Sequence, residues 1–210
     1  MNTLTTVGHP LVEHHLARLR DRTTPPAEFR QLLHRLAALL AYEATQDLPT
    51  RDVEVTTPLT TTTCRVLAAK VGLIPILRAG LGMVDPILEL IPIAEVWHLG
   101  VYRDEATARP VEYYSKLPQS HPVDVALVLD PMLATGGSAL AALGALQAWG
   151  VQQVKLLSII ASKPGLDRVW TEFPNTHIHV CAVDPILDDR KYIVPGLGDA
   201  GDRSFNTLRD

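Results

Sequence analysis

The stretch VLDPMLATGGSA, residues 128–139, decides how this chain folds. It joins the end of an apolar run, VDVALVLD (123–130), to an Ala- and Leu-rich segment, SALAALGALQAWG (138–150), through a short loop of small residues. A continuous apolar run bounded by turn residues is typical of a buried strand, and the segment after it predicts a helix that Gly150 terminates. The stretch therefore predicts a strand, a glycine-containing turn and a helix, with Asp130 as the last residue of the strand.

The same alternation of strands and helices continues on both sides of this stretch. Apolar runs predict strands at 53–59, 71–77, 94–102, 154–161 and 178–184, and helical spacing predicts helices at 11–20, 27–42, 83–91 and 165–173. The threonine run 60–63 is expected to be a turn, Pro75 marks a strand end or an irregularity, and segment 103–118 predicts an arm or hairpin. Continuous apolar strands alternating with helices predict an α/β fold whose central sheet is mostly parallel and flanked by helices. We expect one domain, residues 1–210, because the sequence contains no linker and no internal repeat.

Composition narrows the class of function. The net charge of −4 gives no electrostatic case for binding nucleic acid or an anionic membrane, although a local positive charge can still bind a phosphorylated small molecule. No long apolar run opens the sequence, so we expect neither a secretory signal nor a membrane-spanning helix. Cys64 and Cys181 are far apart in or near apolar segments, which favours reduced thiols and a reducing, cytoplasmic compartment.

The loop after Asp130 has the composition of a phosphate site. Parallel sheets bind ligands at the carboxyl ends of their strands, and glycines let backbone N–H groups converge there beside the positive end of the next helix. Thr135 and Ser138 add hydroxyl groups, and a carboxylate nearby suits the hydroxyl groups of a ribose. The loop contains neither G-x-x-x-x-G-K-[ST] nor G-x-G-x-x-G, so it favours a sugar phosphate over a nucleoside triphosphate or NAD. The alternative is a plain strand-to-helix turn that contains glycines.

Two arginines follow other predicted strands. Arg78 is the only charge in LRAGLG (77–82), and Arg103 comes directly after the strand 94–102. An arginine stays charged and can hold two phosphate oxygens at once, so both are candidates for binding a diphosphate. The alternative for each is a solvated surface charge.

Long motifs in the same order resemble the type I phosphoribosyltransferases, which use 5-phosphoribosyl 1-diphosphate (PRPP). The common loop has two acids, whereas this one has Asp130-Pro131-Met132, which resembles the uracil phosphoribosyltransferase branch. The segments that agree extend from about His9 to Thr207 and include GLIPILRAGLGMVD (72–85), LGVYRDE (99–105), PVEYYSKLP (110–118) and YIVPGLGDAGDR (192–203). Two departures are Lys191 and Asn206, which stand where the family commonly has glycine.

The resemblance implies a fold and a reaction. The fold is the type I phosphoribosyltransferase fold with a β-arm, at about 103–118, and a C-terminal hood that binds the base, at about 185–207. The reaction is uracil plus PRPP giving UMP plus diphosphate, a step of pyrimidine salvage, with Mg²⁺ carried by PRPP and no direct protein ligand. A homo-oligomer and a possible GTP effector are also implied. A transferase for another nucleobase, or a non-catalytic sensor of PRPP or UMP, are the alternatives.

Residue roles follow from the same resemblance. Those assigned to catalysis are Arg78, Arg103 and Asp130. Those assigned to PRPP are Arg78, Arg103, Asp130, Pro131, Met132, Leu133, Ala134, Thr135, Gly136, Gly137, Ser138 and Asp199. Those assigned to uracil, through backbone groups, are Tyr192, Ile193, Gly198, Asp199 and Ala200. Tyr113, Tyr114 and Lys116 of the arm are expected to close over the site, and Asp184 and Asp199 are candidates for a general base. His14, His15, His177 and His179 lack a third ligand at metal spacing, so we expect no metal there.

Overall fold

The computed structural model describes residues 3–103, 110–115, 117–118 and 120–207, and for 101–103 and 110–115 it describes the backbone alone. The helices are α1 (Pro10–Arg20), α2 (Pro26–Ala44), the 3-10 turn η1 (Ala79–Met83), α3 (Val84–Leu90), α4 (Gly137–Trp149), α5 (Lys163–Glu172) and α6 (Ala200–Phe205). The strands are β1 (Thr3–Thr6), β2 (Thr50–Thr56), β3 (Thr61–Leu67), β4 (Val71–Leu77), β5 (Glu95–Val96), β6 (Leu99–Arg103), β7 (Pro110–Ser115), β8 (Val125–Leu129), β9 (Met132–Leu133), β10 (Gln153–Ser162), β11 (His177–Asp184), β12 (Ile186–Leu187) and β13 (Ile193–Val194).

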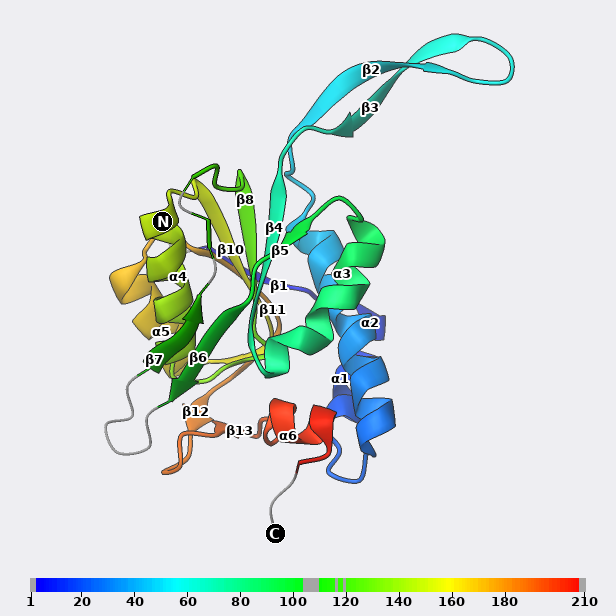
Figure 1. Ribbon diagram of the computed structural model, residues 1–210. Coiled ribbons are helices and arrows are strands. Elements are labelled where there is room, and N and C mark those ends of the chain that lie inside the picture. Colours follow the sequence, from blue (N-terminus) through cyan, green and yellow to red (C-terminus); the bar gives the residue numbers. More distant parts are fainter. Residues whose placement is uncertain (1–2, 104–109, 116, 119, 208–210) are drawn as a thin grey trace.

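A twisted sheet forms the centre of the molecule (Figure 1). Its strand order is β1-β11-β10-β8-β4-β6-β7, with β5 beside β4 and β9 beside β10. In the described part of the chain every pair of this sheet is parallel except β6–β7. The predicted α/β class with a mostly parallel sheet is therefore confirmed.

Helices cover both faces of the sheet, as its continuous apolar strands require. On β8, Val125, Leu127 and Leu129 pack with α1, α2 and α3, whereas the alternate residues Ala126 and Val128 pack with α4 and α5. Because side chains alternate across a strand, a strand that is apolar at every position must be buried on both faces. The two helical layers stand on opposite sides of the sheet in Figure 1.

The β2–β3 hairpin departs from the sequence prediction. The turn expected at 60–63 is wrong: the hairpin turns at 57–60, where the Thr57 amide donates to the Thr60 carbonyl (2.9 Å), and β3 begins at Thr61. Threonine is β-branched and suits a strand, and the run pairs with β2 in a register that ends at Thr56 opposite Thr61. The hairpin extends away from the body of the molecule (Figure 1).

Segment 94–102, expected as one strand, is divided into β5 and β6. β5 pairs with β4 at Gly72 and Leu73, and β6 pairs with it at Ile76 and Leu77. Pro75 lies between these two contacts, where a residue without an N–H group fits the interruption. Strand β1 at the sheet edge and helix α6 in the tail were not anticipated from the sequence. Within the described residues, no helix is both long and apolar enough to cross a membrane.

Candidate active site

Two adjoining cavities lie at the carboxyl edge of the sheet. The larger, about 310 Å³, is lined by Ala79, Asp130, Met132, Ala134, Arg190, Lys191, Tyr192, Gly198, Asp199, Ala200 and Gly201. The smaller, about 170 Å³, is lined by Asp130, Met132, Leu133, Ala134, Thr135, Gly136, Gly137, Ser138, Ala139 and Lys191. The two cavities share Asp130, Met132, Ala134 and Lys191, so one ligand with two parts can occupy both.

The position of these cavities follows from the order of the strands. β4 and β8 are neighbours, with Pro75 opposite Leu129, yet α3 after β4 and α4 after β8 cover opposite faces of the sheet. In α/β sheets, ligands bind in the crevice between two neighbouring strands whose following helices lie on opposite faces of the sheet. A Cβ atom on Gly80 would lie 2.3 Å from the Leu129 carbonyl oxygen, so only glycine lets the two loops approach this closely.

The smaller cavity is formed by the turn before α4. Gly136 has a left-handed backbone (φ 76°), and no side chain caps the helix that begins at Gly137. The first N–H groups of a helix have no partner within the helix, so they are available to an anion. Thr135 and Ser138 line the same space. The geometry suits a phosphate monoester.

Helix α5 supports this turn from behind. The Ser162 hydroxyl donates to the Ala134 carbonyl (2.5 Å) and accepts from the Gly165 amide (2.9 Å), and Arg168 Nη1 donates to the Thr135 carbonyl (3.1 Å). A Cβ on Gly165 would lie 2.3 Å from the Ala134 carbonyl oxygen. Close contact with α5 therefore fixes the shape of the phosphate turn.

Asp130 lies where the two cavities meet. Its Oδ1 accepts a long hydrogen bond from the Met132 amide (3.4 Å). Burial raises the pKa of Asp130 to about 7, and the negative charge on Asp199 adds to the increase. The proximity of these carboxylates gives the site two groups able to accept hydrogen bonds from hydroxyl groups of a sugar.

Arg78 follows β4 at the edge of the larger cavity. Its guanidinium pairs with the Asp202 carboxylate (3.0 Å) and donates to Thr207 Oγ1 (3.4 Å). A Cβ on Gly201 would lie 3.7 Å from Arg78 Nη2 and 3.2 Å from Asp199 Oδ1, which places the arginine beside the cavity lining. The Leu77–Arg78 peptide bond is cis.

The C-terminal loop is attached to helix α1 by a buried ion pair. Both oxygens of Asp184, which is 4% exposed, accept from Arg20 (2.7 Å each), and Oδ2 also accepts from the Gly196 amide (3.0 Å). Arg20 donates further to the Gly196 carbonyl (2.7 Å). A carboxylate bound on both oxygens is better suited to positioning this loop than to acting as a general base.

Two other arginines hold the helix that follows the loop. Arg203 donates to the backbone carbonyls of Leu19, Asp21 and Leu197 (2.6–2.8 Å), and Arg30 donates to the Ser204 carbonyl (2.8 Å). Asp199 is the N-cap of α6, accepting from the Asp202 amide (2.8 Å). The C-terminal hood is thus fixed to the N-terminal helices.

The structure brings together most of the residues predicted for the site. Asp130, Met132–Ser138, Tyr192 and 198–200 line the two cavities, and Arg78 lies at their edge. Pro131 is absent from the lining, and Ile193 is buried in the core (3% exposed), so a contact with the base can involve only its backbone.

The predicted arm is only partly described. Arg103 ends β6, and Tyr113 and Tyr114 lie on β7, where only the backbone is described. Lys116 lies outside the described residues. The predictions for these four side chains remain predictions.

Sequence reasoning missed Arg190 and Lys191 as cavity residues. They directly precede Tyr192, the first residue of the glycine-rich motif, and two adjacent cations there were the available signal. It also missed Arg20, whose partner Asp184 is 164 residues away. Pairing over such a distance leaves no periodic pattern in a single sequence.

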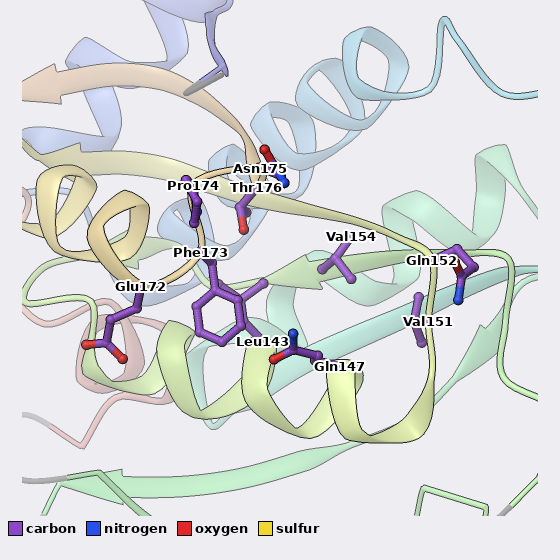
Figure 2. Close-up of a pocket in the computed structure, with 10 residues that line it drawn as sticks. All are labelled: Leu143, Gln147, Val151, Gln152, Val154, Glu172, Phe173, Pro174, Asn175 and Thr176. Atoms are coloured by element: carbon purple, nitrogen blue, oxygen red, sulfur yellow. The ribbon is translucent and has the colours of Figure 1, made fainter.

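A further cavity, about 260 Å³, lies between the ends of α4 and α5 and the start of β10 (Figure 2). Phe173 and Leu143 form its apolar wall, and Glu172 points outward beside them (Figure 2). Among the described residues that line it, Glu172 alone is ionisable. This surface offers no group for the chemistry of the main site.

A buried group of ionisable residues lies at the amino end of β10 and β11. The Lys155 ammonium, within the core, donates to the Ala44 carbonyl (2.6 Å) and pairs with Asp47. His179, 3% exposed, stacks on His177 at 4.0 Å. Burial lowers the pKa of His179 to about 4, and the charges on His177 and Lys155 contribute. Among the described residues, no group of three or more His, Cys, Asp and Glu side chains is placed to hold a metal ion.

Comparisons with known proteins agree with this geometry. The family model described as uracil phosphoribosyltransferase matches residues 6–207. Proteins named uracil phosphoribosyltransferase are similar over nearly the whole chain: 57% identity in Roseiflexus sp. (95% of this chain, 96% of that one) and 52% in Symbiobacterium thermophilum (99% and 100%).

Solved structures support the same fold. A protein from Aquifex aeolicus superposes with a TM-score of 0.92 at 36% identity, covering 97% of this chain and 98% of that one. An adenine phosphoribosyltransferase from Thermoanaerobacter pseudethanolicus, at 13% identity, shares the fold alone, with a TM-score of 0.50 over 78% of this chain and 86% of that one. These matches give one explanation for the acid after β8, the glycine-containing turn before α4 and the C-terminal loop: the chain belongs to the uracil phosphoribosyltransferase family.

Proposed function

We propose that this protein transfers the phosphoribosyl group of PRPP to uracil, giving UMP and diphosphate, as a step of pyrimidine salvage. The observation that carries the proposal is the pair of joined cavities, one bounded by a phosphate turn and the other by the glycine-rich C-terminal loop. The bond from the anomeric carbon to the diphosphate oxygen breaks, the bond from that carbon to uracil N1 forms, and the N1 proton is released. The smaller cavity would hold the 5′-phosphate of PRPP, and the larger cavity would hold uracil.

The 135–138 turn and Asp130 contribute mainly by positioning PRPP. The amides of the 135–138 turn hold the 5′-phosphate, and Asp130 accepts hydrogen bonds from the ribose hydroxyl groups. Holding both reactants in reacting geometry removes much of the entropic barrier to their combination. Asp199, which lines the larger cavity with Asp130, is a second acceptor for the ribose.

The arginines stabilise the negative charge of the leaving group. Negative charge grows on the departing diphosphate, and Arg78, with Arg103 of the arm, would neutralise it. Arg78 pairs with Asp202, which holds its guanidinium beside the cavity. Asp130 and Asp199 both line the larger cavity, and their carboxylate oxygens would suit Mg²⁺, a hard cation that prefers oxygen ligands. Mg²⁺ carried by PRPP would supply further neutralisation of the leaving group.

Base recognition is assigned to backbone groups of the C-terminal loop. The cavity wall there includes Gly198, Ala200 and Gly201, whose small size leaves the peptide groups accessible. Uracil presents two carbonyl groups and an N3–H, whereas cytosine presents an amino group that would meet a donor. A site whose groups form hydrogen bonds with the edge of uracil should disfavour cytosine by about 10⁴-fold in kcat/KM.

One assay tests the reaction and its alternatives. Labelled uracil, cytosine, adenine and guanine are each incubated with PRPP and Mg²⁺, and the nucleotide product is measured. We expect UMP alone. A product only with a purine would assign the chain to another nucleobase, and binding of PRPP without any product would favour a sensor. Adding GTP to the uracil reaction tests the effector that the resemblance implies.

We also propose that the protein is a homo-oligomer, with the β2–β3 hairpin as a contact between copies. Within the described residues the two strands pair only with each other, and side chains on both sides of the hairpin are exposed, including Val55, Leu59 and Val66. An isolated two-stranded ribbon is marginally stable in water, so packing against another surface would stabilise it. A reducing, cytoplasmic location remains our proposal, supported by Cys64 and Cys181 being free thiols.

Analytical ultracentrifugation tests the contact. The paired change Val55→Lys and Val66→Lys is expected to lower the association constant while the far-ultraviolet circular dichroism stays unchanged. Tyr42→Lys, at a 69%-exposed residue on α2 outside the hairpin, is the control. A monomeric wild-type protein at micromolar concentration would contradict the proposal.

A further inference from the structure

Lys191 occupies a backbone position that a side chain does not favour. β12 and β13 pair antiparallel, and the turn between them is closed by the Asp188 amide donating to the Tyr192 carbonyl and the Lys191 amide donating to the Asp188 carbonyl (2.9 Å each). This closure places Lys191 in the left-handed region (φ 68°). Glycine or asparagine adopts that region with little strain, whereas a lysine is disfavoured there. Backbone strain of this kind is concentrated at functional sites.

The same lysine lines both cavities of the candidate active site. In the smaller cavity, which is formed by the phosphate turn, Asp130 and Lys191 are the only ionisable residues among the described lining residues. Every other anion-binding group there is an amide or a hydroxyl. Of the described residues that line this cavity, Lys191 alone carries a full positive charge next to the position that suits a phosphate monoester.

The surroundings of Lys191 leave its ammonium group available. Among the described residues, no side chain or carbonyl is within hydrogen-bond or ion-pair distance of Lys191 Nζ. Arg168, the other cation near the turn, donates to the Thr135 carbonyl from the side of α5 and does not line the cavity. Arg190 lines the larger cavity but not the smaller one.

We infer that Lys191 is a phosphate-binding residue, whose ammonium group pairs with the 5′-phosphate of the phosphoribosyl substrate while that phosphate rests on the 135–138 turn. The inference rests on the proposed function, since it takes PRPP as the ligand. The turn thus retains an unfavourable backbone conformation at this position because the side chain binds substrate. Replacing Lys191 by glycine should therefore stabilise the protein and weaken its binding of the substrate phosphate.

Three variants separate charge from strain. Lys191→Met removes the charge and keeps the strained side chain, Lys191→Arg keeps the charge, and Lys191→Gly removes both. Calorimetric titration with ribose 5-phosphate, and with PRPP, should give a Kd that is about three- to tenfold higher for the Met and Gly variants and close to wild type for Arg, as for one partly exposed ion pair. Titration with diphosphate alone should be unchanged in all three.

Two readouts distinguish a binding role from a structural one. The affinity for ribose 5-phosphate should fall less steeply with added NaCl in the Met variant than in the wild type, because one screened ion pair is gone. The Tm of the Gly variant should rise by about 2–4 °C. His121→Gly is the matched control: His121 also has a positive φ (59°) but lies before β8, at the opposite edge of the sheet, so its Tm should rise without any change in Kd.

The outcomes are separable from those of the uracil assay. A Met variant that binds ribose 5-phosphate as tightly as wild type overturns the inference and leaves the proposed function standing. Loss of diphosphate affinity in place of ribose 5-phosphate affinity also overturns it. Weakened ribose 5-phosphate binding in a protein that does not convert uracil supports Lys191 as a phosphate-binding residue and removes the proposed reaction.

Discussion

Asp130 directly follows strand β8, and its half-buried side chain lines both cavities. Its pKa is raised to about 7 from 3.8, so at neutral pH the free protein contains both the acid and the carboxylate. A carboxylate accepts hydrogen bonds from ribose hydroxyl groups better than the neutral acid does. We expect the affinity for PRPP to fall as the pH drops through about 7, while Asp130→Asn weakens PRPP far more than uracil and abolishes this pH dependence. Equal losses for both substrates would exclude the ribose contact.

Ionisation of Asp130 lowers the stability of the folded protein, although it improves the binding of PRPP. Because the folded-state pKa lies above the unfolded value of 3.8, the folded protein binds the proton more tightly. The resulting stabilisation is fully present below pH 3.8 and is lost as the pH rises through about 7. Asp130→Asn should therefore raise the Tm at pH 8, measured by calorimetry, although it weakens the substrate. A residue that lowers stability and improves binding is typical of an active site.

Arg78 gives a second prediction at the level of one residue. Arg78→Lys keeps the charge that pairs with Asp202 but removes the planar fork, so we expect kcat to fall about tenfold or more. Steady-state kinetics at saturating uracil measure this. A raised KM with an unchanged kcat would mean that the arginine binds ground state and transition state equally.

Among the secondary-structure elements, the loop between β13 and α6 depends on the Arg20–Asp184 pair. Asp184→Asn cannot accept from both Arg20 and the Gly196 amide in the same way, so the loop should loosen. We expect the KM for uracil to rise more than the KM for PRPP, with a loss of unfolding free energy of about 3 kcal/mol. Urea unfolding and initial-rate kinetics check both parts. Arg20→Met, which breaks the same pair, should have the same effects, and Arg18→Met, which removes exposed ion pairs of the same helix, is its control.

Contact between α5 and the phosphate turn supplies another prediction. In Gly165→Ala the new methyl group would meet the Ala134 carbonyl at 2.3 Å, so the turn must shift. We expect weaker binding of ribose 5-phosphate and a lower Tm. Gly144→Ala, within α4 where a Cβ meets no atom within 4 Å, should instead stabilise the protein by about 0.5–1 kcal/mol. If both variants bound ribose 5-phosphate equally, α5 would not determine the shape of the turn.

Prediction from sequence succeeded where one element determines the outcome. β8 is apolar at every position and β10 is buried at every position from 155 to 162, which only a sheet covered on both faces accommodates, and Asp130 had to lie at its carboxyl edge. It failed where the structure depends on a partner outside the local pattern. The threonines of β3 form a strand only because β2 lies opposite them, and Lys191 reaches the cavity only because the β12–β13 turn reverses the chain there.

For the whole molecule, the buried His179 near the amino edge of the sheet predicts a stability that depends on pH. The pKa of His179 in the folded state is about 4, below its unfolded value of 6.5, so its stabilisation is present above pH 6.5 and is lost as the pH falls toward 4. Asp130 acts in the opposite sense over part of this range, so the comparison must be between variant and wild type. From pH 7 to pH 5, the Tm of His179→Leu should fall less than that of the wild type. Parallel pH profiles of the two Tm values would contradict the lowered pKa.

The attachment of the C-terminal hood has a consequence for how the protein is made. Arg20, Arg30 and the Leu19 carbonyl find their partners at Asp184, Ser204 and Arg203, between 164 and 184 residues later in the chain. During translation, this surface of helices α1 and α2 therefore stays exposed until nearly all of the chain has been synthesised. The last residues of the chain also complete the wall of the larger cavity, so a chain that ends before residue 193 lacks residues 198–201 of that wall and the contacts of Arg203 and Ser204 with the N-terminal helices.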